Sequence, residues 1–276
     1  MLEPKLYIIA TPLGNRNDIT LRAIAILTEL DWIFAEDSRE TMKLLEIHGI
    51  KVSGKHVQSF ASHNMKEATR RAIQVLKEGK AVGLVSDRGT PAISDPGALL
   101  VRRAREENIP VVPIPGPSSV TALLSVTGWD TDRFVFLGFL PTSEAERGQW
   151  FDRVADLGWP ICFFESPKRV RETAFAVKAK FPEGRLFVGR EMTKTFEEYT
   201  EYLATELEPE NLLEKGEYVL AILPGNLPSK TERTFEAEIA LRLGSDKEWA
   251  KEMAGRYAMT SKDLYNALQD AKRRKL

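Results

Sequence analysis

The stretch SDRGTPAISDPG, from Ser86 to Gly97, follows the short apolar segment Ala81–Val85 and is rich in Gly, Pro, Ser and Asp. A second loop of this kind, PIPGPSS at Pro113–Ser119, follows the apolar segment Pro110–Val112. In open α/β sheets, small ligands bind to loops at the carboxyl ends of the strands. Because the two loops lie so close in sequence, they predict a ligand that is held mainly by backbone N–H and C=O groups. The alternative is a pair of ordinary strand-to-helix turns.

The composition is typical of a soluble globular protein, with 43% hydrophobic and 29% charged residues. The length of 276 residues fits two domains of moderate size. No apolar run approaches the roughly 20 residues of a membrane helix. The N-terminus does not have the charged and then apolar pattern of a signal peptide. We therefore expect a cytoplasmic protein with no membrane partner.

Charge and residue usage narrow the kinds of site that the chain can form. The formal net charge of −1 gives no overall field that attracts nucleic acid, so any basic surface has to be local. The tail KRRK at 272–275 is such a patch, although a short basic terminus is more often a solvated end. The single cysteine, Cys162, lies in an apolar run and is expected to be a buried, inert thiol. Three histidines and no cysteine cluster lead us to expect no metal site.

Apolar runs and amphipathic segments alternate along the first half of the chain, as in repeated strand–helix units. Such units predict a mainly parallel sheet with helices on its faces. The strands are expected at residues 6–10, 32–35, 57–60, 81–85 and 110–112.

Capping residues predict the starts of two helices in this half. Asp18 or Thr20 is expected to cap the first of them. Its buried face is expected to consist of Leu21, Ile24, Ala25 and Thr28. Asp95 is expected to cap another helix, with Pro96 at the favoured first position, that reaches about Glu107.

The second half predicts a mixed sheet, because its last strands are expected to pair antiparallel. Its strands are expected at residues 134–137, 161–164, 186–189, 196–203 and 218–223. We place an N-terminal α/β domain at 1–115, a C-terminal α/β domain at 116–226, and a helical C-terminal extension at 227–276. The fold class is therefore α/β, with two such domains and a helical appendix.

The turn after the first strand, TPLGN at Thr11–Asn15, does not have the form of a dinucleotide fingerprint. The sequence contains neither G-x-G-x-x-G after that strand nor the P-loop pattern G-x-x-x-x-G-K-[ST]. NAD, FAD and P-loop nucleotides are therefore disfavoured as ligands, while the two binding-type loops still require an explanation.

Six motifs occur in a defined order along the chain. They are ATPLGNRNDIT (10–20), AEDSR (35–39), SDRGTPAISDPG (86–97), PIPGPSS (113–119), FFESPKR (163–169) and GREMTK (189–194). Together they resemble the tetrapyrrole-methylase-type (class III) S-adenosylmethionine methyltransferases. They are most similar to the branch that 2′-O-methylates a cytidine of bacterial small-subunit (16S) ribosomal RNA. The resemblance covers about residues 5–225 and extends to the helical tail.

The resemblance implies a homodimer in which S-adenosylmethionine lies in the cleft between the two α/β domains. The cofactor contacts it implies are Pro12, Leu13, Gly14, Asp87, Gly89, Thr90, Ile93, Ser94, Pro115, Gly116, Ser118, Ser119, Gly138, Phe139 and Leu140. One residue departs from the pattern, since Arg88 occupies a position that is commonly alanine in the family. Its side chain is expected either to point to solvent or to reach RNA phosphate or the cofactor carboxylate.

Methyl transfer to a ribose hydroxyl requires an in-line arrangement and gains from a base or a nearby cation. The candidate bases are the carboxylates Glu36, Asp37 and Glu165, which follow predicted strands. A structural ion-pair cluster that caps the next helix is the alternative for the first two. The candidate RNA contacts are Arg39, Lys168, Arg190 and Lys194, with Lys272, Arg273 and Arg274 in the tail. Solvated surface charges are the alternative for these.

Two other functions compete with RNA methylation. The first is C-methylation of a tetrapyrrole precursor by the same chemistry, and the second is a non-catalytic ribosome-assembly factor. The AEDSR and FFESPKR motifs and the basic tail favour RNA over a tetrapyrrole. Because the net charge is close to zero, we expect the assembled small ribosomal subunit to be a better substrate than isolated RNA.

Overall fold

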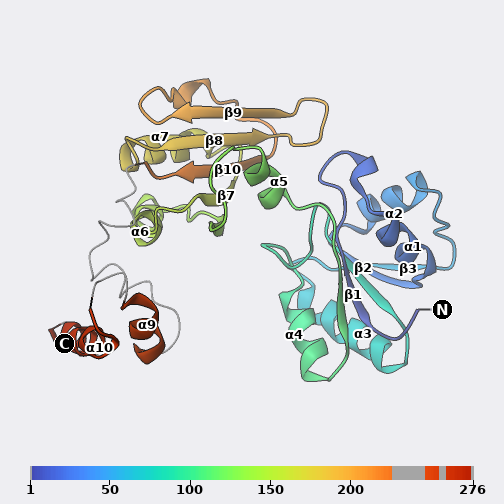
Figure 1. The fold of residues 1–276 in the computed structure, drawn as a ribbon. Coiled ribbons are helices and arrows are strands. Elements are labelled where there is room, and N and C mark those ends of the chain that lie inside the picture. Colours follow the sequence, from blue (N-terminus) through green and yellow to red (C-terminus); the bar gives the residue numbers. More distant parts are fainter. Residues whose placement is uncertain (1, 226–245, 255–258, 275–276) are drawn as a thin grey trace.

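The structure, a computed structural model, describes residues 2–225, 246–254 and 259–274 (Figure 1). Its first sheet has five strands, β1 (Leu6–Ile9), β2 (Trp32–Ala35), β3 (His56–Ser59), β4 (Val82–Val85) and β5 (Val111–Ile114). They follow the order β3-β2-β4-β1-β5, and every pairing is parallel. Pro113 is tolerated within β5 because this strand forms an edge of the sheet.

Four α-helices cover both faces of the first sheet (Figure 1). They are α1 (Leu21–Glu29), α2 (Ser38–Ile47), α3 (Met65–Lys77) and α4 (Ala98–Glu106), and the short 3-10 helix η1 (Arg16–Asp18) precedes α1. Since neighbouring residues of a strand point to opposite faces, each strand contributes to two cores. Phe34 packs with α3 and α4 in one core, and Ile33 packs with α1 and α2 in the other.

The second sheet contains β6 (Val135–Phe139), β7 (Ile161–Glu165), β8 (Arg185–Arg190), β9 (Glu198–Leu203) and β10 (Tyr218–Leu223). The order is β6-β7-β10-β8-β9, with β6 and β7 parallel and the other pairs antiparallel. The helices are α5 (Ser119–Ser125), α6 (Glu144–Ala155) and α7 (Val170–Lys180), with the short 3-10 helix η2 (Pro209–Asn211) before β10. The predicted combination of a parallel and a mixed sheet is confirmed.

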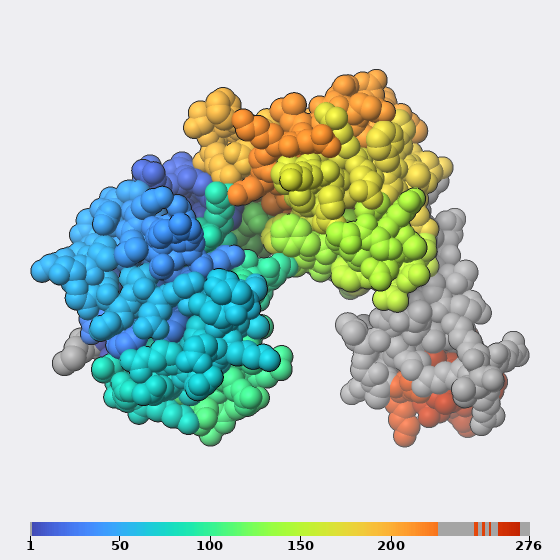
Figure 2. All heavy atoms as spheres, turned by 180° about the vertical axis from the view of Figure 1, so that it is seen from behind, coloured from blue at the N-terminus to red at the C-terminus, as the bar shows by residue number. Residues whose placement is uncertain are grey.

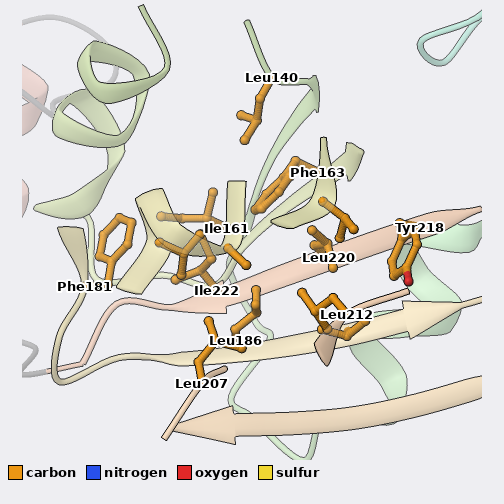
Figure 3. Close-up of a cluster of buried hydrophobic side chains, with 14 of the residues drawn as sticks. Leu140, Ile161, Phe163, Phe181, Leu186, Leu207, Leu212, Tyr218, Leu220 and Ile222 are labelled. Atoms are coloured by element: carbon orange, nitrogen blue, oxygen red, sulfur yellow. The ribbon is translucent and has the colours of Figure 1, made fainter. Parts of the chain in front are cut away.

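The largest core of the second sheet lies between its strands and the helices α6 and α7 (Figure 3). Phe163 of β7 and Leu220 of β10 are fully buried there, and Phe151 of α6 stacks edge-on against Phe181 at the end of α7. The opposite face is covered by α5 and contains the buried Cys162. Burial raises the pKa of the Cys162 thiol to about 12, so this thiol is inert, as predicted.

The helix α1 is rotated relative to the prediction. Thr20 is its cap, and its hydroxyl accepts a hydrogen bond from the backbone N–H of Ala23 at 3.1 Å. Ala23 and Leu27 are buried, whereas Leu21 is 85% exposed. The predicted face of Leu21, Ile24, Ala25 and Thr28 was therefore wrong. A second apolar stripe at helical spacing, which begins at Ile19 and continues to Leu30, faces the sheet instead.

The predicted cap of α4 was also wrong. This helix begins at Ala98, and its N-cap is Gly97, whose φ of 144° suits glycine. Asp95 therefore lies in the loop before the helix. Ala92 and Ser94 in the same loop have left-handed φ values of 68° and 59°, which are unusual for residues with a side chain.

Two helices, α9 (Asp246–Met253) and α10 (Ser261–Arg274), form the described part of the C-terminal extension. They pack against each other, with Leu264 and Leu268 buried and the Gln269 amide donating a hydrogen bond to Asp246 at 2.7 Å. Residues 226–245 lie outside the described part, and the three domain ranges stay predictions. In the described residues no helix has the length and apolar character to span a membrane, and no group of three or more side chains suits a metal ion.

Leu27→Ala is expected to lower the free energy of unfolding by about 2–5 kcal/mol, because it removes buried methyl groups from the core. The matched control Leu21→Ala should change it by less than about 0.5 kcal/mol, since this side chain is exposed. Urea unfolding followed by circular dichroism measures both. Equal losses would contradict the orientation of α1.

Candidate active site between the two sheets

Four strands of the first sheet end level with one another at a single edge. Ala35 of β2 and Ile9 of β1 both pair with Val85 of β4, and Ile9 also pairs with Ile114 of β5. The turns that follow these strands therefore start side by side. This register brings four of the six sequence motifs to one place.

Hydrogen bonds from backbone and hydroxyl groups connect these turns to one another. Thr11 and Gly89 exchange two backbone hydrogen bonds, at 2.9 and 3.1 Å. The Ser86 hydroxyl donates to the carbonyl of Gly89 at 3.3 Å, and the Thr90 hydroxyl donates to the carbonyl of Pro117 at 3.2 Å. The turn after β1 and the loops 86–97 and 115–119 are thus fixed relative to one another.

Glycine is required where the two α/β units approach each other. A Cβ atom on Gly14 would lie 2.4 Å from Cγ of Lys194. Gly138 has a φ of 66°, and a Cβ atom there would lie 2.9 Å from the hydroxyl of Ser94. The backbone N–H of Asn15 also donates to the Thr193 hydroxyl at 2.9 Å, which adds a hydrogen bond between the units.

A cavity of about 510 Å³ lies between the two units, in the region where Figure 2 shows a hollow between the two lobes. Its walls come from the strand ends of the first sheet and from β6, β7, β10 and the start of α5 in the second unit. The lining residues are Leu13, Glu36, Glu40, Asp87, Arg88, Asp95, Ser119, Phe139, Phe164, Glu165, Ser166, Pro167, Met192, Glu217, Tyr218 and Val219.

The lining of this cavity is acidic and apolar. Among the described residues that line it, six carry carboxylates and Arg88 is the one cation. Phe139 and Phe164 form an edge-to-face pair with ring centroids 5.4 Å apart, and Phe139 is 56% exposed. Such a lining suits a ligand with a positive charge and a flat apolar part.

A second, smaller cavity of about 260 Å³ adjoins the first and shares Leu13, Glu40, Asp87 and Arg88 with it. Its lining carries four cations, Arg16, Lys43, Arg88 and Lys194. Positive charge therefore lies next to the acidic cavity. Lys194 reaches this cavity from the second unit, where its ammonium lies 3.0 Å from the Glu217 carboxylate and 2.8 Å from that of Glu191.

Arg88, the residue that departs from the family pattern, forms an ion pair with Glu217 of the second unit. Its side chain is 44% exposed, so the pair lies at the surface of the cleft and not deep within it. Surface pairs contribute at most about 1 kcal/mol to stability. The guanidinium thus links the two units at the mouth of the cavity.

Asp37 and Glu165, two of the three predicted bases, are occupied by structural contacts. Asp37 is the N-cap of α2, and Arg39 binds its carboxylate through the backbone N–H at 2.8 Å and the guanidinium at 2.7 Å. Arg39 holds the pKa of Asp37 well below its usual range. The buried Glu165 accepts hydrogen bonds from Thr173 at 2.6 Å and pairs with Arg169 at 2.6 Å. Both carboxylates therefore have structural partners within their own unit.

Glu36, the third predicted base, lines the large cavity at the end of β2. Its carboxylate accepts a hydrogen bond from the backbone N–H of Asp87 at 3.2 Å. The Asp87 carboxylate in turn accepts one from the backbone N–H of Asp37 at 2.8 Å. These reciprocal bonds tie the ends of β2 and β4 together.

Asp95 was predicted to cap a helix, but it belongs to the candidate site instead. It lines the large cavity, and burial raises the pKa of its carboxyl to about 7. The charges of Glu36 and Asp87 add to this rise, while a hydrogen bond to the Ser86 side chain opposes it. The sequence signal that could have placed Asp95 in the site is its position within the motif SDRGTPAISDPG.

The predicted cofactor residues either line one of the two cavities, lie next to the lining residues, or point into the core of the second sheet. Leu13, Asp87, Ser119 and Phe139 line the large cavity, and Pro12 and Gly14 line the smaller one. The loops that carry those residues also contain Gly89, Thr90, Ile93, Ser94, Pro115, Gly116 and Ser118, and Gly138 lies in β6 next to Phe139. The side chain of Leu140 points into the core of the second sheet (Figure 3), although its carbonyl accepts a hydrogen bond from Arg169 at 3.2 Å.

The predicted RNA contacts differ in exposure. The Arg39 side chain is 79% exposed, and Lys168 is also exposed. Arg190 and Lys194 are 14% and 21% exposed, and both form ion pairs with glutamates of their own unit. The backbone of Lys272, Arg273 and Arg274 belongs to α10, but their side chains lie outside the described part of the chain.

The profile of the family Tetrapyrrole (Corrin/Porphyrin) Methylases matches residues 5–208, which include both sheets up to β9. The chain belongs to the tetrapyrrole methylase family. This confirms the resemblance, and membership of a methyltransferase family implies the use of a methyl donor.

Curated members of the tetrapyrrole methylase family are similar to this chain over most of its length. A protein of Neisseria meningitidis serogroup B, named Ribosomal RNA small subunit methyltransferase I, is 43% identical over 79% of this chain and 76% of its own. The protein of that name from Halalkalibacterium halodurans is 36% identical over 95% of this chain and 93% of its own.

Solved structures show the same fold at low sequence identity. A diphthine synthase matches with a TM-score of 0.65 and 18% identity over 86% of this chain and 94% of its own. Cobalt precorrin-4 methyltransferase, a cobalamin biosynthetic enzyme, matches with a TM-score of 0.57 and 20% identity over 79% of this chain and 94% of its own.

Arg169→Gln is expected to lower the free energy of unfolding by about 3–5 kcal/mol, because it leaves the buried Glu165 carboxylate without its cation. The matched control is Lys168→Gln at the neighbouring exposed position, which should change it by no more than about 0.5 kcal/mol. Thermal and urea unfolding measure both variants. A loss no larger than that of the control would show that Glu165 does not depend on this pair.

Proposed function

We propose that this protein transfers a methyl group from S-adenosylmethionine to the 2′ oxygen of a cytidine ribose in 16S ribosomal RNA. The observation that carries the proposal is the similarity to the Halalkalibacterium halodurans rRNA methyltransferase, which extends over nearly the whole length of both chains. The position of the sequence motifs around one interdomain cavity supports it.

The residues of the large cavity fit the proposed cofactor. S-adenosylmethionine supplies a methyl group that its sulfonium charge has already activated. The carboxylates of Glu36, Asp87 and Asp95 favour a positive charge in the cavity, and Phe139 and Leu13 offer apolar surface to the rest of the ligand. Backbone groups of the loops 86–97 and 115–119 are available as further donors and acceptors.

The charges around the cleft fit an RNA acceptor. Arg16 and Lys43 line the smaller cavity beside the acidic one, and Arg39 and Lys168 are exposed. Phosphates would meet these cations, while the ribose hydroxyl would enter the acidic cavity. This separation lets one cleft hold both a cationic donor and an anionic polymer.

The wider setting is part of the same proposal. We propose a homodimer that acts in the cytoplasm on the assembled small ribosomal subunit and uses no metal ion. The near-neutral net charge supports the assembled particle as substrate, because a weakly charged protein gains little from naked RNA alone.

Transfer of labelled methyl from S-adenosylmethionine to small ribosomal subunits that lack their native modifications tests the function. Naked RNA of the same sequence is assayed alongside, and subunits that already carry the native modifications are the control. We expect label at a single cytidine, resistant to alkaline cleavage there because the 2′ oxygen is blocked. Absence of label from both substrates, with cofactor binding intact by calorimetry, would contradict the proposal and favour a small-molecule acceptor such as a tetrapyrrole precursor.

Arg39→Gln is expected to weaken RNA binding several-fold and to reduce the dependence of log K on log salt by about one unit, as for the loss of one phosphate contact. Binding is measured over a series of KCl concentrations. The matched control is Arg105→Gln, an exposed arginine of α4 that lines neither cavity. Equal slopes for the two variants would remove Arg39 from the RNA contacts.

A further inference from the structure

Three carboxyls of the large cavity, those of Glu36, Asp87 and Asp95, have no ion-pair partner in the described part of the chain. Asp95 lines the cavity and forms no ion pair within the described part of the chain. None of the described residues lining the cavity is His, Cys or Lys, so a proton acceptor there has to be a carboxylate or Tyr218. Burial raises the pKa of the Tyr218 phenol, which therefore stays protonated at neutral pH, and its hydroxyl donates to the carbonyl of Leu213.

The other carboxylates of the cavity are engaged. Glu40 pairs with Lys43 at 2.7 Å, and Glu217 pairs with Lys194 and Arg88. Glu165 is held by Arg169 and Thr173, as described above. These three carboxylates therefore already have partners in the folded chain.

Glu36 and Asp87 remain beside Asp95, and both accept backbone hydrogen bonds that join β2 to β4. Those bonds give the two carboxylates a structural role at the strand ends. Two negative charges close to Asp95 favour its protonated form. Of the three, Asp95 is the carboxyl that lines the cavity without such a strand-joining bond in the described part of the chain.

We propose that Asp95 is the catalytic base that accepts the proton of the acceptor hydroxyl during methyl transfer. The inference rests on the proposed function, since it assigns a residue to that reaction. Asp95 takes the place of Asp37 and Glu165 as the predicted proton acceptor, because the contacts of those two residues are structural.

In the proposed step, the hydroxyl oxygen forms a bond to the methyl carbon as its O–H bond breaks, and the proton passes to a carboxylate oxygen of Asp95. The bond between the methyl carbon and sulfur breaks, and its electron pair stays on the sulfur, which becomes a neutral thioether. Asp95 then returns the proton to solvent through the open cleft. The step needs no other reactant.

The acidity of Asp95 suits this task. A general base works best when its pKa lies near the operating pH, and burial raises the pKa of this carboxyl to about 7. The charges of Glu36 and Asp87 contribute to this raised pKa, and the Ser86 hydrogen bond opposes it. A cation in the cavity also lowers it, so the ionised, proton-accepting form predominates at neutral pH once the donor is bound.

The loop holds Asp95 in place by backbone constraints on both sides. Ser94, immediately before it, has a left-handed φ of 59° and packs against Gly138 of the second unit. Gly97, two residues after it, has a φ of 144° and is the N-cap of α4. A side chain positioned by such a backbone loses little freedom when the substrate binds.

Single-turnover methyl transfer to small ribosomal subunits, measured across pH for the wild type and Asp95→Asn, tests the inference. The wild-type rate should rise with pH up to a plateau, with a midpoint at or below about 7, since the carboxyl must be ionised to accept a proton. Asp95→Asn should be at least about 100-fold slower and should not show that midpoint. Its affinity for S-adenosylmethionine, by calorimetry, should change less than about tenfold, because an anion near a sulfonium contributes modestly to binding.

Two further variants and one spectroscopic measurement complete the test. Asp31→Asn, an exposed aspartate before β2, should retain the wild-type rate, and Asp95→Glu should restore part of the rate and the midpoint. In ¹³C-aspartate-labelled protein, one carboxyl signal should titrate near pH 7 in the wild type and be missing from Asp95→Asn. This signal is read without turnover or RNA.

The outcomes separate the inference from the function. A wild-type rate in Asp95→Asn, or no aspartate signal that titrates near pH 7 in the free wild type, overturns the role of Asp95 and leaves the methyltransferase intact. A wild type that labels no RNA overturns the proposed function and, with it, this assignment.

Discussion

The register of the parallel sheet is the constraint on which the site depends. Because Ile9, Ala35 and Ile114 lie level around the end of β4, four turns leave the sheet together, and their polar backbone groups face one space. Had one strand slipped by a residue, its side chains would point to the opposite face and its turn would leave the group. The continuous apolar cores on both faces prevent such a slip.

The second unit supplies the part of the cavity wall that the first sheet does not provide. Its lining residues supply the aromatic wall of the cavity and several of its carboxylates, so neither unit holds the site alone. The contacts between the units are short-range and specific. Gly14 lies against Lys194, Gly138 lies against Ser94, and Arg88 pairs with Glu217.

The two signs of charge in the cleft gather in adjoining cavities. Carboxylates line the large cavity, while the cations of the smaller cavity border it and partly pair with its acidic residues. A uniformly basic cleft would attract RNA more strongly but would repel a sulfonium. Separating the two signs over adjacent surfaces would meet both needs of the proposed reaction while leaving the net charge close to zero.

The sequence predicted the strands well because continuous apolar runs such as Leu6–Ala10 are governed by local pattern. Local pattern could not predict which face of α1 is buried, because the helix has two apolar stripes. Packing on the sheet buries Leu27 and leaves Leu21 exposed. The sequence Asp-Pro-Gly suits the start of a helix as well as a loop, so the local pattern predicted Asp95 as a cap. The Arg88–Glu217 pair joins residues far apart in sequence, and no local pattern predicts it. In the candidate site, the motifs predicted which loops meet but not which carboxylates are engaged.

The carboxyl of Asp95 also couples folding to acidity. An aspartate in an unfolded chain titrates near 4, whereas burial raises the pKa of Asp95 to about 7 in the folded protein. Between these two values the folded chain retains a proton that the unfolded chain releases, so folding stability declines as the pH rises through that interval. A cation bound in the cavity favours the ionised carboxylate and opposes the decline. A cationic ligand therefore stabilises the fold most strongly in alkaline solution, where the empty cleft carries its full electrostatic repulsion.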